Sequence, residues 1–254
     1  MNNTILHIDI ITIFPNFFTS PIKEGLIGKA IKKGLINISI HNLRDYTSNK
    51  HKQVDDSVYG GGAGMVLKPE PLFNAIKKIK KYKNSRVILT SPTGSKFNQS
   101  TAIKFKNYKQ LIIICGRYEG IDQRIIDNFI DEEISIGDYI LNGGELAALV
   151  ISETTARLIK GVVGKIASLE ADSFSKNILD HSNYTRPEKF LKYNIPNVLK
   201  SGNHNQIENW RLYSRISNTF YYRPDLFKDT VLSSQESVAL KEIISSPKGV
   251  SNYE

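Results

Sequence analysis

Three glycine-bearing loops, each following an apolar run, constrain this chain more than any other feature. Their sequences are LTSPTGSKF (Leu89–Phe97), CGRYEGIDQR (Cys115–Arg124) and SIGDYILNGGE (Ser135–Glu145). Glycine tolerates positive φ and close backbone approach, which suits loops that wrap a ligand with their own N–H and C=O groups. One such loop would be an ordinary strand-to-helix connection. Three of them, each at the end of a strand, predict a binding site.

The first 160 residues alternate between patterns typical of strands and of helices. Strands are predicted at Leu6–Phe14, Ile36–His41, Arg86–Thr90, Leu111–Cys115 and Glu132–Ile136. Helices are predicted at Pro21–Lys33, Pro69–Tyr82, Asn98–Asn107, Ile121–Ile130 and Glu145–Lys160. This alternation predicts an α/β fold with a largely parallel sheet flanked by helices, in which ligands bind beyond the carboxyl ends of the strands. The sequence has neither the glycine fingerprint of a standard dinucleotide fold nor a P-loop, so both are disfavoured.

A long polar segment, Arg44–Met65, interrupts this alternation. A loop of that length is uncommon and usually functional or disordered. Its end, Tyr59–Met65, is too rich in glycine for a helix or a paired strand. Asp55, Asp56 and Tyr59 beside the glycines indicate backbone approach to a ligand or a partner chain, with a flexible linker as the alternative.

A small, mainly helical second domain is predicted near the end of the chain. Gly161–Lys176 is small, polar and weakly periodic, which is typical of a connection between domains. Helices are predicted at Gln206–Tyr222 and Ser233–Ile244, among arginines, histidines and aromatic residues. We therefore expect a binding and catalytic domain at 1–160, a linker at 161–176 and a helical domain at 177–254.

The composition favours a cytoplasmic protein with a polyanionic partner. Lys and Arg number 34 against 25 Asp and Glu, a net charge of +9, which favours nucleic acid through phosphate neutralisation. The single cysteine, Cys115, excludes a disulfide framework and a cysteine-rich zinc site. We expect neither membrane insertion nor secretion, because no apolar run approaches the roughly 20 residues of a membrane helix and the first residues lack a signal-peptide pattern. The lysines after Pro69 indicate a solvated helix face or, less often, a phosphate-contacting patch: Lys77, Lys78, Lys80 and Lys81.

In their order and spacing, these segments resemble the bacterial tRNA (guanine-N1)-methyltransferase family, knotted enzymes of the SPOUT class. The resemblance covers nearly the whole chain. It runs through ITIFP, DDSVYGGGAGM, SPTG, CGRYEGIDQR, SIGDYILNGGE, GVVG, DSF, HSNYTRPE, SGNH and RPDL. One departure is Ala63, where the family commonly has proline, and this change removes no functional group.

The resemblance implies that the three loops enclose S-adenosylmethionine and that the chain forms a trefoil knot, although chains are in general unknotted. It also implies tRNA as the partner and a homodimer whose active sites are shared between subunits. No metal ligand is assigned, because the family's Mg²⁺ dependence has no recognisable ligand cluster here, so we expect RNA or substrate to hold any ion. The implied cofactor-binding positions are Leu89, Ser91, Pro92, Gly94, Gly116, Glu119, Ser135, Ile136, Gly137, Asp138, Tyr139, Ile140, Leu141, Gly143 and Gly144.

The implied reaction transfers a methyl group to N1 of the guanine at tRNA position 37, beside the anticodon. That nitrogen carries a proton, so the reaction needs a base at N1 and a cation or donor near O6, where negative charge develops. The resemblance assigns the base to Asp172 and O6 stabilisation to Arg157. Without the resemblance, the residues alone favour Asp172 as a helix N-cap and Arg157 as a solvated arginine on a helix. Glu119 is the alternative base, although its loop position better suits neutralising the sulfonium charge.

Basic and aromatic residues of the second domain are the candidates for RNA contact. Arginine binds phosphate, and an aromatic ring can stack on an extruded base. His204 is also an acid–base candidate, but positioning of substrate or a structural hydrogen bond is favoured for it. The candidates are Tyr184, Arg186, His204, Arg211, Arg215 and Arg223.

Two other functions are alternatives to this one. One is a related knotted enzyme that modifies a ribose 2′-hydroxyl, which would not need Asp172 in the same place. The other is a non-catalytic RNA-binding protein with the same fold. The presence of Asp172, Arg157 and the glycine loop weighs against the latter.

Overall fold

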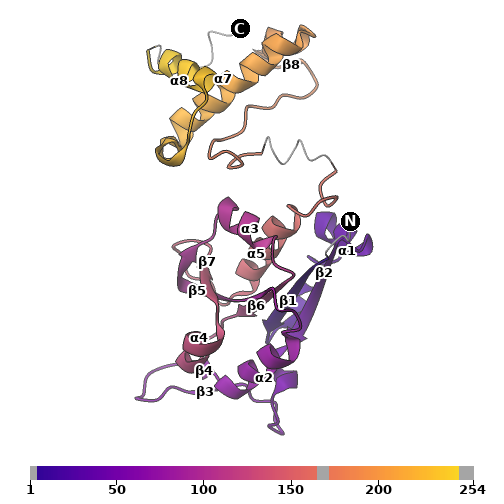
Figure 1. Cartoon of the computed structure of the whole chain (residues 1–254), viewed down its shortest axis with the longest axis vertical. Coiled ribbons are helices and arrows are strands. Elements are labelled where there is room, and N and C mark those ends of the chain that lie inside the picture. Colours follow the sequence, from indigo (N-terminus) through magenta and orange to yellow (C-terminus); the bar gives the residue numbers. More distant parts are fainter. Residues whose placement is uncertain (1–4, 165–171, 246–254) are drawn as a thin grey trace. The chain divides into compact units, whose positions relative to one another are not determined.

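The computed structural model describes residues 5–164 and 172–245. The chain divides into two compact units, Met1–Ile166 and Ala167–Glu254 (Figure 1). The boundary between them falls inside the predicted connection Gly161–Lys176, of which residues 165–171 lie outside the described part of the chain.

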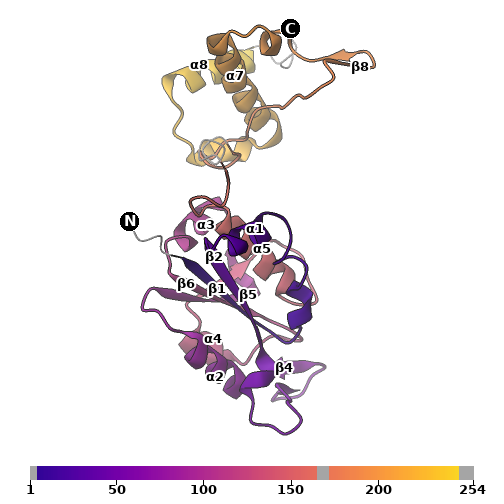
Figure 2. The ribbon, with the colours of Figure 1, turned by 90° about the vertical axis from the view of Figure 1, so that its right-hand side faces the viewer.

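The first unit is built on a five-stranded sheet in the order β2-β1-β6-β5-β7 (Figure 1). Figure 2 shows the same sheet turned by 90°. Its strands are β1 (Leu6–Thr12), β2 (Ile36–Asn42), β5 (Ser85–Lys96), β6 (Gln110–Cys115) and β7 (Glu132–Ser135). Every pair of neighbours runs parallel, so the predicted parallel sheet is confirmed. The carboxyl ends of all five strands therefore lie at one edge, where the three glycine loops begin.

Helices cover both faces of this sheet. On one face lie α1 (Gly25–Lys32), α3 (Gln99–Phe105) and α5 (Glu145–Ala156). On the other lie α2 (Pro69–Ile79) and α4 (Gln123–Phe129). The strands supply both cores because successive side chains alternate between faces: Ile113 packs in the first core, and Ile112 and Ile114 pack in the second.

The helices of the first unit are shorter than the sequence predicts. The helix expected from Pro21 begins at Gly25, whose φ of +60° turns the chain into α1. The helix expected to reach Lys160 ends at Ala156. Beyond it the amide of Ile159 donates to the carbonyl of Ala156, an i to i−3 bond that closes a turn after the helix.

The long polar segment carries structure that the sequence analysis did not predict. After the 3₁₀ turns η1 (Pro15–Phe18) and η2 (Leu43–Tyr46), strands β3 (Asp55–Ser57) and β4 (Met65–Leu67) form an antiparallel hairpin. The prediction that Tyr59–Met65 contains no paired strand was wrong at Met65, which pairs with Ser57. The glycines form the hairpin's tip, and three paired residues on each side suffice to close it.

The second unit contains α7 (His204–Tyr222) and α8 (Ser234–Ser245), which pack against each other. Trp210, Ile216 and Ala239 are buried there. The 3₁₀ turns η3 (Asn197–Lys200) and η4 (Pro224–Asp229) flank α7. A short hairpin, β8 (Lys189–Phe190) with β9 (Tyr193–Asn194), precedes η3 and was not predicted.

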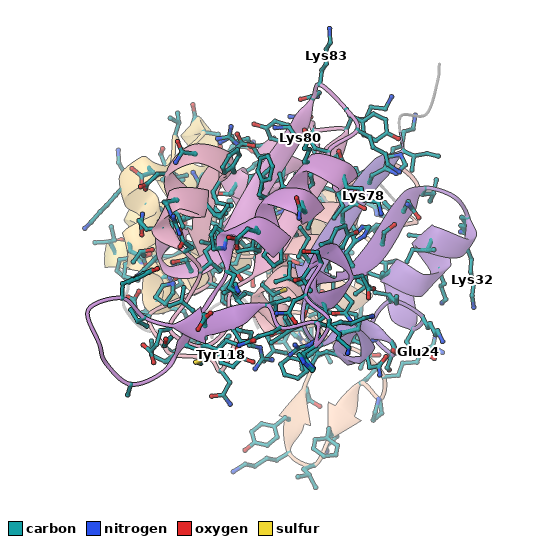
Figure 3. All side chains as sticks on the ribbon, turned by 90° about the horizontal axis from the view of Figure 1, so that it is seen from below. Glu24, Lys32, Lys78, Lys80, Lys83 and Tyr118 are labelled. Atoms are coloured by element: carbon teal, nitrogen blue, oxygen red, sulfur yellow. The ribbon has the colours of Figure 1, made fainter. Side chains whose placement is uncertain are left out.

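The lysines near the end of α2 lie at the surface. The Nζ of Lys77 is 5.8 Å from the centre of the Phe73 ring, and that of Lys78 is 5.6 Å from the centre of the Tyr46 ring. Lys80 follows the last residue of the helix, and Lys83 projects outward from the next turn (Figure 3). The stems of Lys77 and Lys78 therefore cover aromatic surface while their charges stay near water.

Candidate active site

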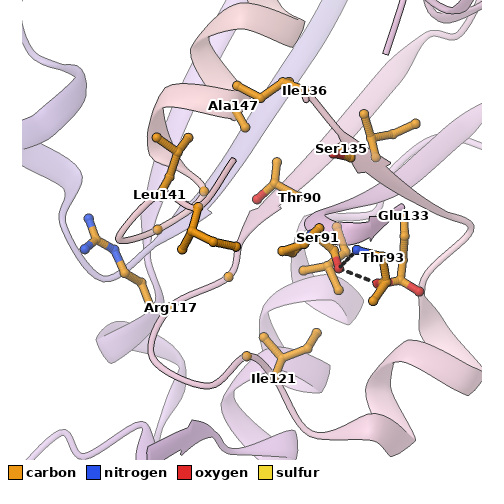
Figure 4. Close-up of a pocket in the computed structure, with 18 of the residues that line it drawn as sticks. Thr90, Ser91, Thr93, Arg117, Ile121, Glu133, Ser135, Ile136, Leu141 and Ala147 are labelled. Carbon is orange, nitrogen blue, oxygen red and sulfur yellow. Dashed lines mark hydrogen bonds between the residues drawn. The ribbon is translucent and has the colours of Figure 1, made fainter. Parts of the chain in front are cut away.

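A cavity of about 670 Å³ lies at a bulge in β5 and at the carboxyl ends of β6 and β7 (Figure 4). Its walls are the three predicted loops together with Ile126 of α4, Glu133 and Ile134 of β7, and Ala147 in the first turn of α5. Small-molecule sites are typically clefts of about 300–1,000 Å³. In parallel sheets such sites lie beyond the carboxyl ends of the strands, as this cavity does.

Most of the predicted cofactor positions line this one cavity. They are Leu89, Ser91, Pro92, Gly116, Glu119, Ser135, Ile136, Gly137, Tyr139, Ile140, Leu141, Gly143 and Gly144. Figure 4 shows Leu141 and Ile121 on different sides of it. The structure thus gathers residues that lie more than 50 positions apart in the sequence.

Gly94 and Asp138 do not line the cavity. Gly94 packs on β7, where an added Cβ would lie 2.4 Å from the carbonyl carbon of Glu133. Asp138 is exposed and pairs with Lys96, with an Oδ2 to Nζ distance of 2.6 Å. In this structure the first is required for chain packing and the second forms a surface ion pair.

The wall at β5 is a widened bulge. Thr90 and Ser95 both pair with Ile134, so the residues between them loop out of the strand. The hydroxyl groups of Ser91 and Thr93 are 2.6 Å apart, and Thr93 donates a 2.8 Å hydrogen bond to Glu133 (Figure 4). The sequence predicted that the strand ends at Thr90, whereas it resumes after the bulge.

The hairpin in the polar segment supports the loop after β6. The amide of Glu119 donates to the carbonyl of Met65 at 3.0 Å, and Leu67 pairs with Ile121. An added Cβ on Gly64 would lie 2.5 Å from the Cγ of Glu119. The glycine-dense segment therefore contacts a wall of the cavity from behind.

The loop after β7 passes the end of β5 and returns to β6. The amide of Gly144 donates to the carbonyl of Gly116 at 2.9 Å, and Gly143 forms a bridge with Arg117. An added Cβ on Gly144 would lie 1.9 Å from the Oγ1 of Thr90 and 2.9 Å from the Cα of Cys115. Only glycine leaves room for this crossing.

A buried ion pair lies beside that crossing. Glu145 is 1% exposed and receives a 2.8 Å hydrogen bond from the Oγ1 of Thr12. The Nη2 of Arg117 lies 2.8 Å from its Oε2. The guanidinium of Arg117 also donates to the carbonyl of Asn142 at 3.1 Å and lies 4.5 Å from the centre of the Phe14 ring. This cluster could not be predicted from the sequence, because 28 residues separate Arg117 from Glu145 and no local pattern links them.

The single cysteine is buried next to the same cluster. Burial raises the pKa of the Cys115 thiol well above its ordinary value of 9.0. The nearby Glu145 carboxylate raises that pKa further, and the Arg117 guanidinium opposes the rise. The thiol is therefore neutral at physiological pH.

The two predicted catalytic residues belong to different units. Arg157 is the C-cap residue that directly follows α5 in the first unit, and it is partly buried. Asp172 belongs to the second unit, where its carbonyl accepts a 3.2 Å hydrogen bond from the amide of Ser175.

Several of the predicted RNA-contacting residues have partners within the second unit. Tyr184 is half exposed, with its ring centre 6.0 Å from that of Trp210. Arg223 pairs with Asp225 at 2.7 Å and lies over the Phe174 ring. Arg211 pairs with Glu208 one turn away on α7, and Arg215 lies one turn further along. His204 begins α7, and Arg186 is exposed.

No group of three or more His, Cys, Asp or Glu side chains in the described residues could hold a metal ion. Among the helices formed by residues 5–164 and 172–245, none is both long and apolar enough to cross a membrane.

The family profile of the tRNA (Guanine-1)-methyltransferase TrmD matches residues 6–229. The chain belongs to this family. The match begins in β1, spans all three loops of the cavity and continues through η4, so it includes both Arg157 and Asp172. The resemblance indicated by the sequence motifs is confirmed.

Relatives are similar over almost their entire length. The tRNA (guanine-N(1)-)-methyltransferase of Sulfurihydrogenibium sp. strain YO3AOP1 is 51% identical over 240 residues, which cover 94% of each chain. The one from Buchnera aphidicola subsp. Schizaphis graminum is 48% identical over 243 residues, 95% of this chain and 93% of the relative. That of Bacillus cereus strain G9842 is 46% identical over 240 residues, 94% of this chain and 98% of the relative.

Proposed function

We propose that this protein transfers a methyl group from S-adenosylmethionine to N1 of the guanine at tRNA position 37. The observation that carries the proposal is the family match over residues 6–229, which includes every loop of the cavity and both catalytic candidates. The net charge of +9 supports a polyanionic partner. A tRNA substrate also supports action in the cytoplasm.

The chemical groups around the cavity are of the types that would bind S-adenosylmethionine. Leu89, Ile121 and Leu141 offer apolar surface to a flat base, and the glycine loops offer backbone N–H and C=O groups. Glu119 and Glu133 bring carboxylates to a ligand that carries positive charge. When bound, S-adenosylmethionine supplies an electrophilic methyl group on a sulfonium sulfur.

The protein's own part in the reaction is to manage one proton and one developing charge. Asp172 accepts the proton from N1, which makes that nitrogen nucleophilic. Arg157 donates to O6, where negative charge builds up as the proton leaves. Since N1 lies on the Watson–Crick edge, the target guanine must be unpaired, as it is in an anticodon loop.

A homodimer completes each active site in this proposal, with Arg157 from one subunit and Asp172 from the other. The support in the first unit is an exposed apolar surface on α5 and beside η1. Leu146 and Val150 are 49% and 43% exposed, and Phe14 and Phe17 are 46% and 42% exposed. The crossing of the β7–α5 loop past β5 supports the accompanying trefoil knot.

The test is methyl transfer from labelled S-adenosylmethionine to an unmodified tRNA transcript, followed by nucleoside analysis. A transcript with adenine at position 37 is the matched control. We expect 1-methylguanosine from the first transcript and none from the second. Methyl groups on ribose, or no transfer to either transcript, would overturn the proposal.

A further inference from the structure

We infer that the Arg117–Glu145 ion pair is a positioning device that holds Asn142–Gly144 in the form that binds the methyl donor. The inference rests on the proposed function for the identity of that donor. Neither residue is among the predicted cofactor contacts. Arg117 lines the cavity, but its guanidinium points away from the centre (Figure 4). Its Nη2 lies 2.8 Å from the Oε2 of Glu145.

The pair ties together three segments that are distant in sequence. Glu145 receives hydrogen bonds from Thr12 at the end of β1 and from the Nε of Arg117 after β6, at 2.8 and 3.0 Å. The Nη1 of Arg117 reaches the carbonyl of Asn142 in the loop after β7, at 3.1 Å. One guanidinium therefore fixes both the carboxylate and the loop backbone that precedes it.

The loop is shaped to admit this arginine. An added Cβ on Gly143 would lie 2.1 Å from the Nε of Arg117. Gly144, the N-cap of α5, has no side chain that could cap the start of that helix. Glu145 is the first residue of α5, where the helix dipole favours a carboxylate. The ion pair thus acts together with the Gly144–Gly116 backbone bond in holding the end of the loop.

Stability alone is a weak explanation for this pair. The Arg117 side chain is 19% exposed and that of Glu145 is 2% exposed. Replacing a buried ion pair with apolar residues of similar size is often neutral or stabilising, whereas removing one partner is costly. What apolar side chains cannot supply is the directed bond to the Asn142 carbonyl.

The same loop carries a second ion pair that serves as a control. Lys96 and Asp138 lie 2.6 Å apart, but their side chains are 67% and 78% exposed. Exposed pairs contribute little to stability. Lys96→Gln removes an ion pair from this loop without touching the cavity, so it separates a general loss of charge from loss of the positioning device.

The experiment uses the full chain and compares wild type with Glu145→Gln, Arg117→Met, Arg117→Lys and Lys96→Gln. Calorimetric titration with S-adenosylhomocysteine gives Kd. Because a buried charged hydrogen bond is lost, we expect Kd to rise roughly tenfold or more in Glu145→Gln and Arg117→Met. Arg117→Lys keeps the charge and should recover part of the affinity, and Lys96→Gln should match wild type. KM for S-adenosylmethionine should rise with Kd, while kcat at saturation should stay within about threefold of wild type.

Hydrogen exchange gives a readout that does not depend on ligand. The Gly144 amide, bonded to Gly116, should exchange faster in Glu145→Gln, while amides in the core strand β6 stay protected. If Glu145→Gln fails to fold, the same test is made by comparing the Kd and the Gly144 exchange rate of Arg117→Lys with those of Lys96→Gln. Unchanged Kd and unchanged exchange in a folded variant would overturn the inference. Failure of wild type to bind S-adenosylhomocysteine would instead count against the proposed donor, and the exchange data would still decide the inference.

Discussion

Gly144 lies where a side chain has no room. Its added Cβ would meet the Thr90 hydroxyl at 1.9 Å, the Cys115 Cα at 2.9 Å and the Gly116 amide nitrogen at 3.1 Å. The last two contacts are backbone, which cannot move without shifting β6. Overpacking of this kind typically costs about 1–3 kcal/mol. We therefore expect Gly144→Ala to lower the free energy of unfolding by about that amount, measured by urea denaturation.

The matched control is Gly164→Ala, since no atom lies within 4 Å of an added Cβ there. This variant should unfold at nearly the wild-type urea concentration. Equal midpoints for the two variants would show that the β7–α5 crossing is looser than the structure describes.

The buried Cys115 thiol makes the free energy of unfolding depend on pH in the alkaline range. Burial raises its pKa well above 9.0, so above that pH the unfolded chain releases a proton that the folded chain retains. The folded state then binds more protons, and the free energy of unfolding falls as pH rises, by up to about 1.4 kcal/mol per pH unit. Urea unfolding between pH 8 and pH 10.5 should show a shallower decline for Cys115→Ala than for wild type. Identical declines would contradict the prediction.

At the scale of elements, α8 depends on a reciprocal cap. The Ser233 amide donates to the Glu236 carboxylate at 2.8 Å, and the Glu236 amide donates to the Ser233 hydroxyl at 3.3 Å. Burial, the largest influence on Glu236, raises its pKa, but hydrogen bonds from Ser233 and the charges of Lys176 and Arg215 lower it overall. This carboxylate thus adds stability above its unfolded pKa, and the gain is lost as pH falls through the lowered value.

We expect Ser233→Ala to destabilise the second unit by about 1 kcal/mol and to speed hydrogen exchange in the first turn of α8. Ser234→Ala, one residue further along at an exposed position, should have little effect. Thermal unfolding followed by circular dichroism, with exchange measured by mass spectrometry, tests both variants. Equal exchange in the two would argue against the cap.

The long elements could be predicted from sequence and the short ones could not. The core strands can be recognised from apolar runs such as LIIIC, because a strand that is buried on both faces needs an apolar side chain at every position. Hairpins β3–β4 and β8–β9 have at most three residues a strand, too few for a periodic pattern. The bulge after Thr90 was hidden for a different reason: Ser95 rejoins β7 through backbone pairing, which leaves no mark on side-chain type.

The cavity, too, has parts that could be predicted from the sequence and parts that could not. Its glycine loops could be found because glycine itself signals unusual backbone. The Arg117–Glu145 pair could not, since an arginine in one loop and a glutamate after another look like two solvated charges until the fold brings them together. Nor could residue patterns find Arg157 and Asp172, for which only the family resemblance supplied a role.

At the scale of the whole molecule, the proposed homodimer makes a quantitative prediction. Arg157→Ala and Asp172→Asn dimers should each be nearly inactive. If the two chains are mixed equally and exchange subunits, half of the dimers contain one chain of each kind. In such a dimer one site combines the intact Arg157 of one subunit with the intact Asp172 of the other, and its second site lacks both. The mixture should therefore reach about one quarter of wild-type activity, because a symmetric dimer has two equivalent composite sites.

The measurement is single-turnover methylation of tRNA by the mixture, with each variant alone as baseline and subunit exchange verified by mass spectrometry. A doubly substituted chain mixed equally with wild type is the control. Its mixed dimers have no site with both residues intact, so only the wild-type homodimers act and about one quarter of wild-type activity should remain, whereas sites formed within one chain would leave about one half. If exchange is complete and the mixture stays at baseline, Arg157 and Asp172 do not come from opposite subunits. That result would place both residues of a site on one chain, and homodimerisation would then need another explanation than shared catalysis.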